Sequence, residues 1–211
     1  MSGSVACAAR QKADLRRELR QRCRELPEEY CRSADRAIAR SLFEAPAFAG
    51  ARQIFCFVGK AGEIDTLPLL RRILEQGSSL CVPLCLEPGR MEARLLRDLE
   101  DLVPGRYGIL EPRPERCPPV EASSLDLALV PCLSATRQGL RLGQGGGYYD
   151  RYLAGGHVPS ILLCREKMLS PELPKEDWDL SFDWLLTEQG FWHQGRKEET
   201  CCVLRRKAPD G

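Results

Sequence analysis

Two hydrophobic patterns divide the chain. Between residues 10 and 43, apolar side chains such as Leu15, Leu19 and Ile38 recur at helical spacing among many charged residues, which predicts two amphipathic helices. After them come short runs of aliphatic and aromatic residues bounded by Gly and Pro, which are typical of buried strands. The predicted helices span residues 10–24, 28–43, 68–76 and 148–153, and the predicted strands span 51–58, 79–86 with a break at Pro83, 91–96, 125–131 and 160–164.

This order of elements predicts the fold class. Because strands alternate with helices, we expect an α/β protein with three layers and a mainly parallel sheet. The 211 residues, 43% of them hydrophobic, are enough for one sizeable core, which we expect to occupy residues 1–189. Residues 190–211 are polar and lack periodicity, and we expect them to form a loosely ordered extension.

Charge and cysteine content narrow the classes of partner. The net charge of +1 creates no overall field, so we expect neither nucleic acid nor a membrane as a partner, and a monomer or weak homodimer acting on small molecules. The sequence has no apolar run of the ~20 residues that a membrane helix needs and no signal-peptide pattern, which predicts a cytoplasmic location. The eleven cysteines include no C-x-x-C pair, so we expect reduced thiols rather than disulfides or a zinc site.

The most distinctive segment is the glycine-rich stretch 141–152, which follows a predicted strand and opens a predicted helix. Four of the five residues 143–147 are glycine, so backbone N–H groups can approach a ligand without Cβ atoms in the way. The free N–H groups at a helix start suit a phosphate. Arg141 and Arg151 flank the turn with positive charge, and Asp150 offers a carboxylate for Mg²⁺.

The glycines alone leave other interpretations open. Their spacing matches neither the dinucleotide fingerprint nor the P-loop, because no Lys-Ser/Thr follows. A tight strand-to-helix connection, with its tyrosines packed on the core, explains the same residues. A dinucleotide site would also need a carboxylate about 20 residues later at a strand end, and neither Glu166 nor Glu172 ends a predicted strand.

A second candidate segment follows the first predicted strand. Glu63 lies on the loop just past the carboxyl end of that strand, where open α/β sheets bind ligands. Thr66 is in position to cap the next helix. The charge pattern of the N-terminal helix by itself indicates a solvated face, and we expect Lys12 on this helix to be exposed.

Three phrases of the sequence resemble one protein family. The run from Val130 to Leu153 resembles the signature of the 5-formyltetrahydrofolate cyclo-ligase family, which is also called methenyltetrahydrofolate synthetase. Residues 105–112 resemble its G-x-x-G-I-x-E-P element, and residues 173–188 its closing phrase L-P-x-E-x-H-D. The resemblance covers residues 10–190 and implies a Rossmann-like fold similar to those of sugar-phosphate isomerases and CoA transferases.

The resemblance also implies a reaction. Members of this family use ATP and Mg²⁺ to cyclise 5-formyltetrahydrofolate to 5,10-methenyltetrahydrofolate, with release of ADP and phosphate. The formyl oxygen would be phosphorylated and N10 would then attack the formyl carbon.

Functional residues follow from the matching positions. The implied nucleotide-binding residues are Lys12, Ala13, Asp14, Leu15, Arg16, Arg141, Leu142, Gly143, Gln144, Gly145, Gly146, Gly147, Tyr148 and Tyr149. The implied folate-binding residues are Val58, Glu63, Tyr107, Gln144, Gly145, Gly146, Gly147 and Tyr148. Asp150 and Asp179 are the implied magnesium ligands, and the implied catalytic residues are Lys12, Arg141, Tyr148 and Tyr149.

The chain departs from the family pattern at three positions. Cys132 replaces a glycine and Thr136 an aspartate before the glycine turn, and Trp178 stands where the family often has histidine. Two other functions stay open at this point. One is a non-catalytic nucleotide- or folate-binding module of the same fold, and the other is an enzyme similar to sugar-phosphate isomerases.

Overall fold

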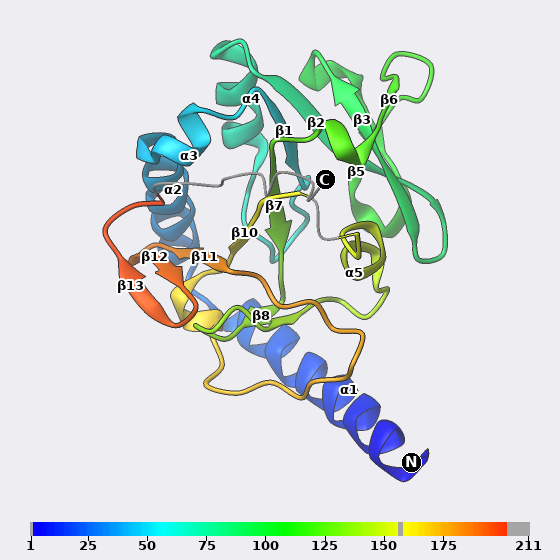
Figure 1. Cartoon of the computed structure of the whole chain (residues 1–211), viewed down its shortest axis with the longest axis vertical. Coiled ribbons are helices and arrows are strands. Elements are labelled where there is room, and N and C mark those ends of the chain that lie inside the picture. The colour runs from blue at the N-terminus through cyan, green and yellow to red at the C-terminus, as the bar shows by residue number, and fades with distance from the viewer. Residues whose placement is uncertain (1, 156–157, 202–211) are drawn as a thin grey trace, which may run out of the picture.

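A large mixed sheet forms the centre of the protein in the computed structural model, which describes residues 2–155 and 158–201 (Figure 1). The strands of this sheet are β1 (Gln53–Cys56), β2 (Ser79–Glu87), β3 (Arg90–Leu96), β6 (Pro119–Val120), β7 (Leu127–Pro131), β10 (Ser160–Leu163), β11 (Trp184–Thr187), β12 (Gly190–His193) and β13 (Arg196–Glu198). Two small hairpins are formed by β4 (Leu102–Pro104) with β5 (Leu110–Pro112), and by β8 (Ser134–Ala135) with β9 (Arg141–Leu142).

Helices connect and cover these strands. The α-helices are α1 (Ser2–Glu25), α2 (Glu28–Glu44), α3 (Pro46–Ala49), α4 (Leu67–Glu75) and α5 (Tyr148–Tyr152). Short 3-10 turns are η1 (Leu99–Asp101), η2 (Arg106–Gly108), η3 (Ala122–Ser124) and η4 (Glu166–Met168). Figure 1 shows α1 crossing the lower part of the molecule and projecting beyond it. Among the described residues, no helix is both long enough and apolar enough to span a membrane.

The strand order explains where a ligand can bind. The order is β13-β12-β11-β10-β7-β1-β2-β3-β6, and the five strands from β11 to β2 pair in parallel. The strands at both edges pair antiparallel. The predicted α/β class is confirmed, with parallel strands in the centre of the sheet and antiparallel strands outside them. Because the central strands point the same way, the loops that follow β1, β7 and β10 all leave the same edge.

The alternation of side chains in β1 shows how both faces of the sheet are buried. Ile54 and Cys56 belong to a core cluster with Ile38 of α2, whereas Phe55 points into a second cluster with Leu19 of α1. All five side chains are at most 1% exposed. Helices therefore cover both faces, which gives the predicted three layers.

Strand β2 continues through Pro83, contrary to the predicted break. Strand β1 pairs only with Ser79, Leu80 and Cys81, so Pro83 lies past the end of this neighbour. Its missing N–H therefore removes no hydrogen bond to β1, while β3 still pairs along its other side at Ala93. Proline is tolerated here because one edge of the strand is open.

The prediction of a loosely ordered extension from residue 190 is wrong over residues 190–198. These residues form β12 and β13, which add a hairpin to the edge of the main sheet. Gln194 and Gly195 make the turn with φ of 48° and 86°, a left-handed pair that is typical of two-residue hairpins. Phe191 is 2% exposed and belongs to the core. Residues 202–211 of the predicted extension lie outside the described residues.

Candidate active site

A cleft of about 910 Å³ lies at the edge of the sheet where β1 and β7 end. Residues of α1, the loop after β1, the glycine-rich segment and the loop before β11 line it. The predicted functional residues that line this cleft are Lys12, Arg16, Val58, Glu63, Tyr107, Arg141, Leu142, Gly143, Gln144, Gly145, Gly146, Gly147, Tyr148, Tyr149, Asp150 and Asp179. Segments far apart in the sequence thus meet at one site.

Three of the predicted nucleotide-binding residues do not reach the cleft. Ala13 and Asp14 are exposed on α1, and Asp14 pairs with Arg17 at 2.7 Å. Leu15 packs against the core under the helix. A helix turns about 100° per residue, so Lys12 and Arg16 share the cleft face while the residues between them point elsewhere.

The glycine turn has a backbone that larger residues would not adopt. Gly145 and Gly147 have φ of 107° and 64°, and Gly147 immediately precedes α5. A Cβ on Gly143 would lie 2.5 Å from the guanidinium of Arg141, so a larger residue here would displace that side chain. No hydrogen bond within the described part of the chain uses the backbone N–H of Gly145, Gly146 or Gly147. These donors are available to an anion in the cleft.

Arginines of α1 hold the turn through its carbonyl groups. Arg16 donates through Nε to the carbonyl of Gly143 at 2.9 Å, and Arg20 donates to the carbonyl of Gln144 at 3.1 Å. Burial, followed by the charge of Arg20, lowers the pKa of Arg16 from its ordinary value. Both arginines therefore bring positive charge to the mouth of the turn.

Lys12 is buried, contrary to the exposed position expected for it. Its side chain is 5% exposed, and Nζ lies 2.5 Å from Glu176 Oε2 and 2.5 Å from Asp179 Oδ2. Asp179 Oδ2 also accepts a hydrogen bond from the backbone N–H of Glu176 at 2.7 Å. One cation thus faces two carboxylates inside the cleft.

The second predicted magnesium ligand is also paired with a cation. Asp150 accepts hydrogen bonds from Arg141 Nη1 at 3.1 and 3.3 Å, while Arg141 Nε donates to the carbonyl of Pro131 at 2.7 Å. The guanidinium lies 5.3 Å from the centre of the Tyr149 ring, and burial raises the pKa of Tyr149 well above its ordinary value. The arrangement orients Asp150 beside the glycine turn, while burial outweighs the charge of Arg141 in setting the pKa of Tyr149.

The two carboxylates of the cleft suit magnesium in their chemistry but do not form a complete ligand set. Asp150 and Asp179 offer the hard oxygen atoms that Mg²⁺ prefers. No group of three or more His, Cys, Asp or Glu side chains in the described residues is arranged to hold a metal. An ion held here would therefore share its coordination with a ligand's phosphates and water, as Mg²⁺ commonly does.

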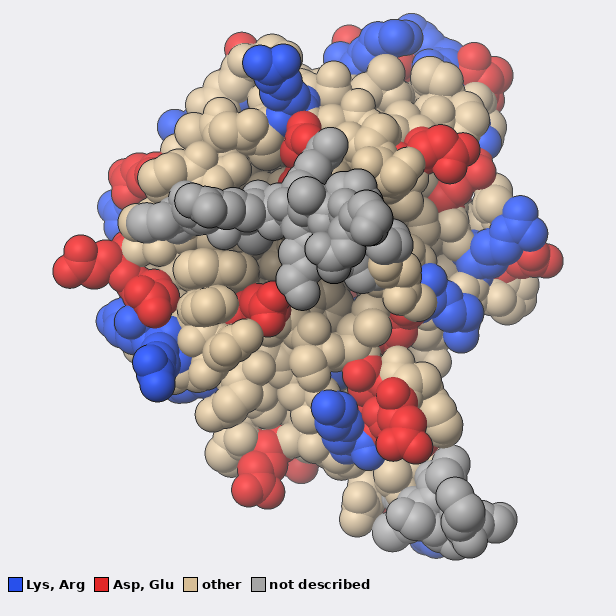
Figure 2. Space-filling model, viewed as in Figure 1, with Lys and Arg blue, Asp and Glu red and all other residues tan. Residues whose placement is uncertain are grey.

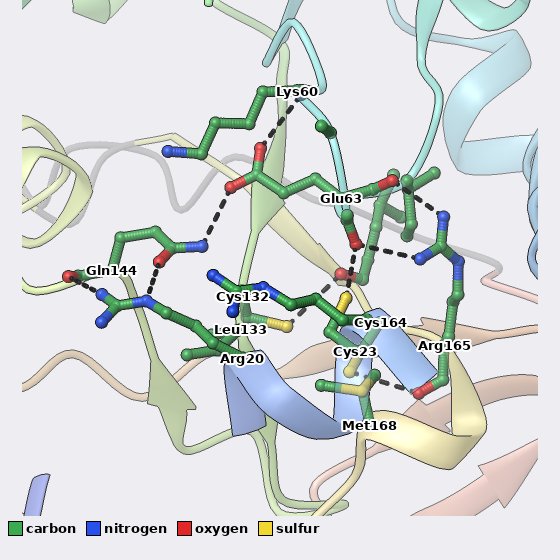
Figure 3. Close-up of a pocket in the computed structure, with 15 residues that line it drawn as sticks. Arg20, Cys23, Lys60, Glu63, Cys132, Leu133, Gln144, Cys164, Arg165 and Met168 are labelled. Carbon is green, nitrogen blue, oxygen red and sulfur yellow. Dashed lines mark hydrogen bonds between the residues drawn. The ribbon is translucent and has the colours of Figure 1, made fainter. Parts of the chain in front are cut away.

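The Glu63 carboxylate lies beside Gln144 of the glycine turn (Figure 3). Its Oε1 accepts from Gln144 Nε2 at 3.3 Å, and its Oε2 accepts from the backbone N–H of Lys60 at 3.4 Å. Gln144 in turn accepts from Arg20 Nε at 3.2 Å. Thr66 occupies the predicted N-cap position of α4, but its hydroxyl donates to Phe57 and accepts from Gly59, so it closes the base of this loop instead of capping the helix.

A buried ion pair behind this loop was not found from the sequence. Arg165, which is 6% exposed, donates to Asp35 at 2.7 and 2.9 Å. It also donates to the carbonyls of Gly62 at 3.1 Å and Glu63 at 2.8 Å (Figure 3). Burial alone would lower the pKa of Arg165, but its hydrogen bonds with Asp35 and the charge of that carboxylate raise it overall. Asp35 also accepts from the backbone N–H of Asp65 at 2.9 Å. The pair holds the loop from two sides.

Part of the cleft wall is apolar and aromatic. Tyr107 is 58% exposed and has φ of 58°, a left-handed conformation that is uncommon for an aromatic residue. Its hydroxyl lies 3.0 Å from that of Tyr148, and this hydrogen bond raises the pKa of Tyr107. The other apolar side chains of this wall are Phe57, Pro83, Met91 and Ile109. A planar ring can pack here.

The three departures from the family pattern have different surroundings. Cys132 lines the cleft and its thiol lies 3.4 Å from the carbonyl of Leu163. Thr136 is buried at the β8–β9 turn, where its hydroxyl accepts from the N–H of Leu140 at 3.2 Å. Trp178 is 60% exposed and lines the cleft. Cys132 and Trp178 are therefore the departures that a ligand can meet.

Charge on the outer surface is mixed. Over the described residues of the face drawn in Figure 2, Lys and Arg side chains alternate with Asp and Glu. Basic groups gather instead in the cleft, beside the glycine turn. The fold and the site together define an α/β protein whose glycine-lined cleft lies at the carboxyl ends of parallel strands, where phosphorylated ligands are commonly bound.

Comparisons with known proteins assign this α/β protein to a family. The model of the 5-formyltetrahydrofolate cyclo-ligase family matches residues 8–188. The 5-formyltetrahydrofolate cyclo-ligase of Mycolicibacterium smegmatis is 30% identical over 190 residues, covering 84% of this chain and 94% of that protein. The enzyme of the same name from Escherichia coli K12 is 28% identical over 180 residues, covering 82% and 98%. The chain belongs to the 5-formyltetrahydrofolate cyclo-ligase family.

Solved structures agree with this assignment. The 5,10-methenyltetrahydrofolate synthetase of Aquifex aeolicus superposes with a TM-score of 0.76 at 25% identity, covering 93% of this chain and 99% of that one. The synthetase of Mycoplasma pneumoniae gives 0.68 at 16% identity, covering 84% and 98%, and supports the fold alone.

Proposed function

We propose that this chain catalyses the ATP-dependent cyclisation of 5-formyltetrahydrofolate to 5,10-methenyltetrahydrofolate, with release of ADP and phosphate. Family membership and the names of its relatives support this reaction. The observation that carries the proposal is one cleft in which a glycine turn, basic side chains of α1 and the carboxylate of Glu63 meet. Such a site can hold a polyphosphate beside a second substrate that carries a planar ring.

The proposed reaction has two chemical steps. The formyl oxygen attacks the γ-phosphorus of ATP and ADP leaves, so the formyl carbon then carries phosphate as a good leaving group. N10 bonds to this carbon and loses its proton, and phosphate departs to leave the methenyl bridge. Phosphoryl transfer requires mainly positioning and neutralisation of charge, so the protein needs no nucleophilic side chain.

In this proposal the phosphates bind between the glycine turn and α1. The free N–H groups of Gly145, Gly146 and Gly147 donate to phosphate oxygens, and Arg16 and Arg141 contribute positive charge. Lys12 leaves its two carboxylates to reach the transferring phosphate. An ammonium that already lies in the cleft needs only a rotation of its flexible side chain for this exchange.

The folate would lie across the apolar wall. Glu63 can accept two parallel N–H bonds from the amide and amino edge of a pterin, which fixes the orientation of that ring. Val58 and Tyr107 would pack on the substrate, and Tyr148, which follows the turn, would align the two substrates. Tyr149, which is kept protonated by burial, can donate its hydroxyl hydrogen.

Asp150 and Asp179 would hold Mg²⁺ together with the phosphates. Bound magnesium would neutralise charge that develops on the transferring phosphoryl group. When Lys12 moves to the phosphate, Asp179 becomes free to bind a cation, since the same carboxylate pairs with Lys12 at 2.5 Å in this structure. Lys12 would thus move toward a negatively charged phosphate, and Asp179 would gain a cation in place of the Lys12 ammonium.

The test measures near-ultraviolet absorbance of the methenyl product after the purified protein is mixed with 5-formyltetrahydrofolate, Mg²⁺ and ATP. We expect the absorbance to rise only when ATP is present and ADP to appear in equal amount. Lys175 lies in the loop that carries Glu176 and Asp179, but it is exposed and does not line the cleft. K175Q is therefore the matched control for K12Q. Nucleotide binding without any rise in absorbance would contradict the proposal and would favour a non-catalytic module.

A further inference from the structure

Trp178 is an exposed aromatic side chain that lines the cleft. Among the described residues, the large hydrophobic side chains that are mostly exposed are Tyr107 and Trp178, at 58% and 60%, and both line the cleft. The other two tryptophans have aromatic or cationic partners. Trp184 stacks on His193 with ring centres 4.5 Å apart, and Trp192 lies 3.9 Å beneath the guanidinium of Arg137. The indole of Trp178 is therefore free to receive a ring from a ligand.

Helix α1 defines an order of contacts along the cleft. Arg20 contacts Gln144, which binds Glu63, so this level of the helix marks the Glu63 end. Arg16, one turn earlier, contacts Gly143 of the glycine turn. From Lys12 to Arg20 the helix rises about 12 Å, at 1.5 Å per residue. The glycine turn therefore meets α1 at the levels of Arg16 and Arg20, and Lys12 lies one helical turn beyond it, away from Glu63.

The far end of the cleft is the level of Lys12. Lys12 pairs there with Glu176 and Asp179, and Trp178 immediately precedes Asp179 in the chain. Ala9, about one turn before Lys12, also lines the cleft. A flat aromatic surface thus adjoins the charged groups proposed to hold phosphate and metal.

We infer that the indole of Trp178 is the stacking surface for the base of the nucleotide. The inference rests on the proposed function, because that function assigns the glycine turn to the phosphates and the Glu63 end to the folate. With both regions occupied, the nucleoside extends toward Lys12 and Trp178. Stacking on an indole requires a planar base but no particular hydrogen bonds, so Trp178 adds affinity for the base without selecting it strongly.

The experiment compares a ligand that has a base with one that lacks it. Calorimetry with Mg²⁺ measures binding of ADP and of inorganic tripolyphosphate to the wild-type chain, W178A and W178F. For W178A we expect the dissociation constant of ADP to rise roughly tenfold, the size of one base–aromatic stack, with that of tripolyphosphate unchanged. W178F keeps a stacking ring and should recover most of the affinity. Because Trp178 is exposed, the melting temperature of each variant should match that of the wild type.

Each alternative gives a different result. Equal ADP affinity in W178A and wild type overturns the inference. An equal loss for ADP and tripolyphosphate also overturns it, because it would mean that Trp178 supports the loop carrying Glu176 and Asp179. If W178A weakened the binding of 5-formyltetrahydrofolate alone, the indole would be assigned to the folate. The proposed stacking on the nucleotide base would then be rejected. An ADP-specific loss in a chain that forms no methenyl product would support the stacking role and reject only the cyclo-ligase activity.

Discussion

Two buried cations, one in the cleft and one behind the Glu63 loop, are held in contrasting ways. Lys12 faces two carboxylates, Glu176 and Asp179, so this group carries surplus negative charge and opens to the cleft. Arg165 faces one carboxylate, Asp35, and uses its remaining donors on the backbone carbonyls of the Glu63 loop. The first group can exchange partners when a cation and an anion arrive together. The second is saturated, so its role is to hold backbone in place.

The largest effect should come from breaking the saturated pair. Arg165→Met leaves the Asp35 carboxylate buried without its cation, and we expect it to lower the free energy of unfolding by about 3–5 kcal/mol. The double variant D35L/R165M removes both charges and should recover part of that loss, while the backbone groups of Gly62, Glu63 and Asp65 stay without their partners. Urea unfolding followed by circular dichroism measures both. A single variant as stable as the wild type would mean that the pair contributes nothing to the fold.

The Lys12 group opens to the cleft, so we expect its loss to lower catalysis as well as stability. Lys12→Gln removes the cation that we assign to the transferring phosphate, and we expect kcat/KM for ATP to fall by roughly 10- to 150-fold, the worth of one charged hydrogen bond. Steady-state rates at limiting ATP measure this, with K175Q as the control that should keep wild-type rates. If K12Q and K175Q behave alike, Lys12 is a structural residue only.

Glu63 lies at the end of the loop that Arg165 holds, and its loss should affect one substrate selectively. Glu63→Gln keeps the shape but replaces charged acceptors with a neutral amide, so we expect KM for 5-formyltetrahydrofolate to rise roughly tenfold while KM for ATP stays constant. The exposed Glu172, which does not line the cleft, gives the control E172Q. A parallel rise in both KM values would show that Glu63 only maintains the cleft.

A smaller effect should distinguish the proposed magnesium ligands from a structural carboxylate. Asp150→Asn weakens one of the two proposed magnesium ligands, so we expect the Mg²⁺ concentration for half-maximal activity to rise several-fold at saturating ATP. A magnesium titration of the initial rate measures this. Asp126→Asn replaces a carboxylate that accepts backbone N–H groups of Arg52 and Gln53 outside the cleft, and its titration should match the wild type. Identical curves for D150N and wild type would remove Asp150 from the metal site.

The smallest effect should come from an exposed ion pair of the same chemistry. Arg32 of α2 pairs with Glu28 at 3.0 Å and Glu29 at 2.9 Å, and water surrounds all three side chains. Screening by solvent and the entropy of long side chains cancel most of such a gain. The urea midpoint of R32Q should therefore equal that of the wild type. A loss comparable to that of R165M would mean that burial does not explain the contrast between the pairs.

Much of the cleft could be predicted because its signals are local in the sequence. The glycines at 143–147 are needed where backbone approaches a ligand or has positive φ, and the spacing of Lys12 and Arg16 places them on one helix face. The glycines of the turn, Lys12 and Arg16 all line the cleft. The same helical spacing points Ala13, Asp14 and Leu15 away from it, so the run of five nucleotide-binding residues was broader than the helix allows.

Other features could not be predicted because their partners are distant in the chain. Arg165 and Asp35 are 130 residues apart, and each resembles an ordinary surface charge when viewed alone. The hairpin of β12 and β13 has a local signal in the turn at Gln194 and Gly195, but its polar residues concealed the pairing with β11.

The sequence by itself determined the α/β class, the position of the glycine turn and the family, because periodicity and motifs depend on residues that are neighbours in the chain. Only the tertiary structure decided that Lys12 is buried between Glu176 and Asp179, that Arg165 holds the Glu63 loop, and that Trp178 faces the cleft. The physical reason is that burial and ion pairing depend on which distant segments meet, and packing of the core sets those meetings.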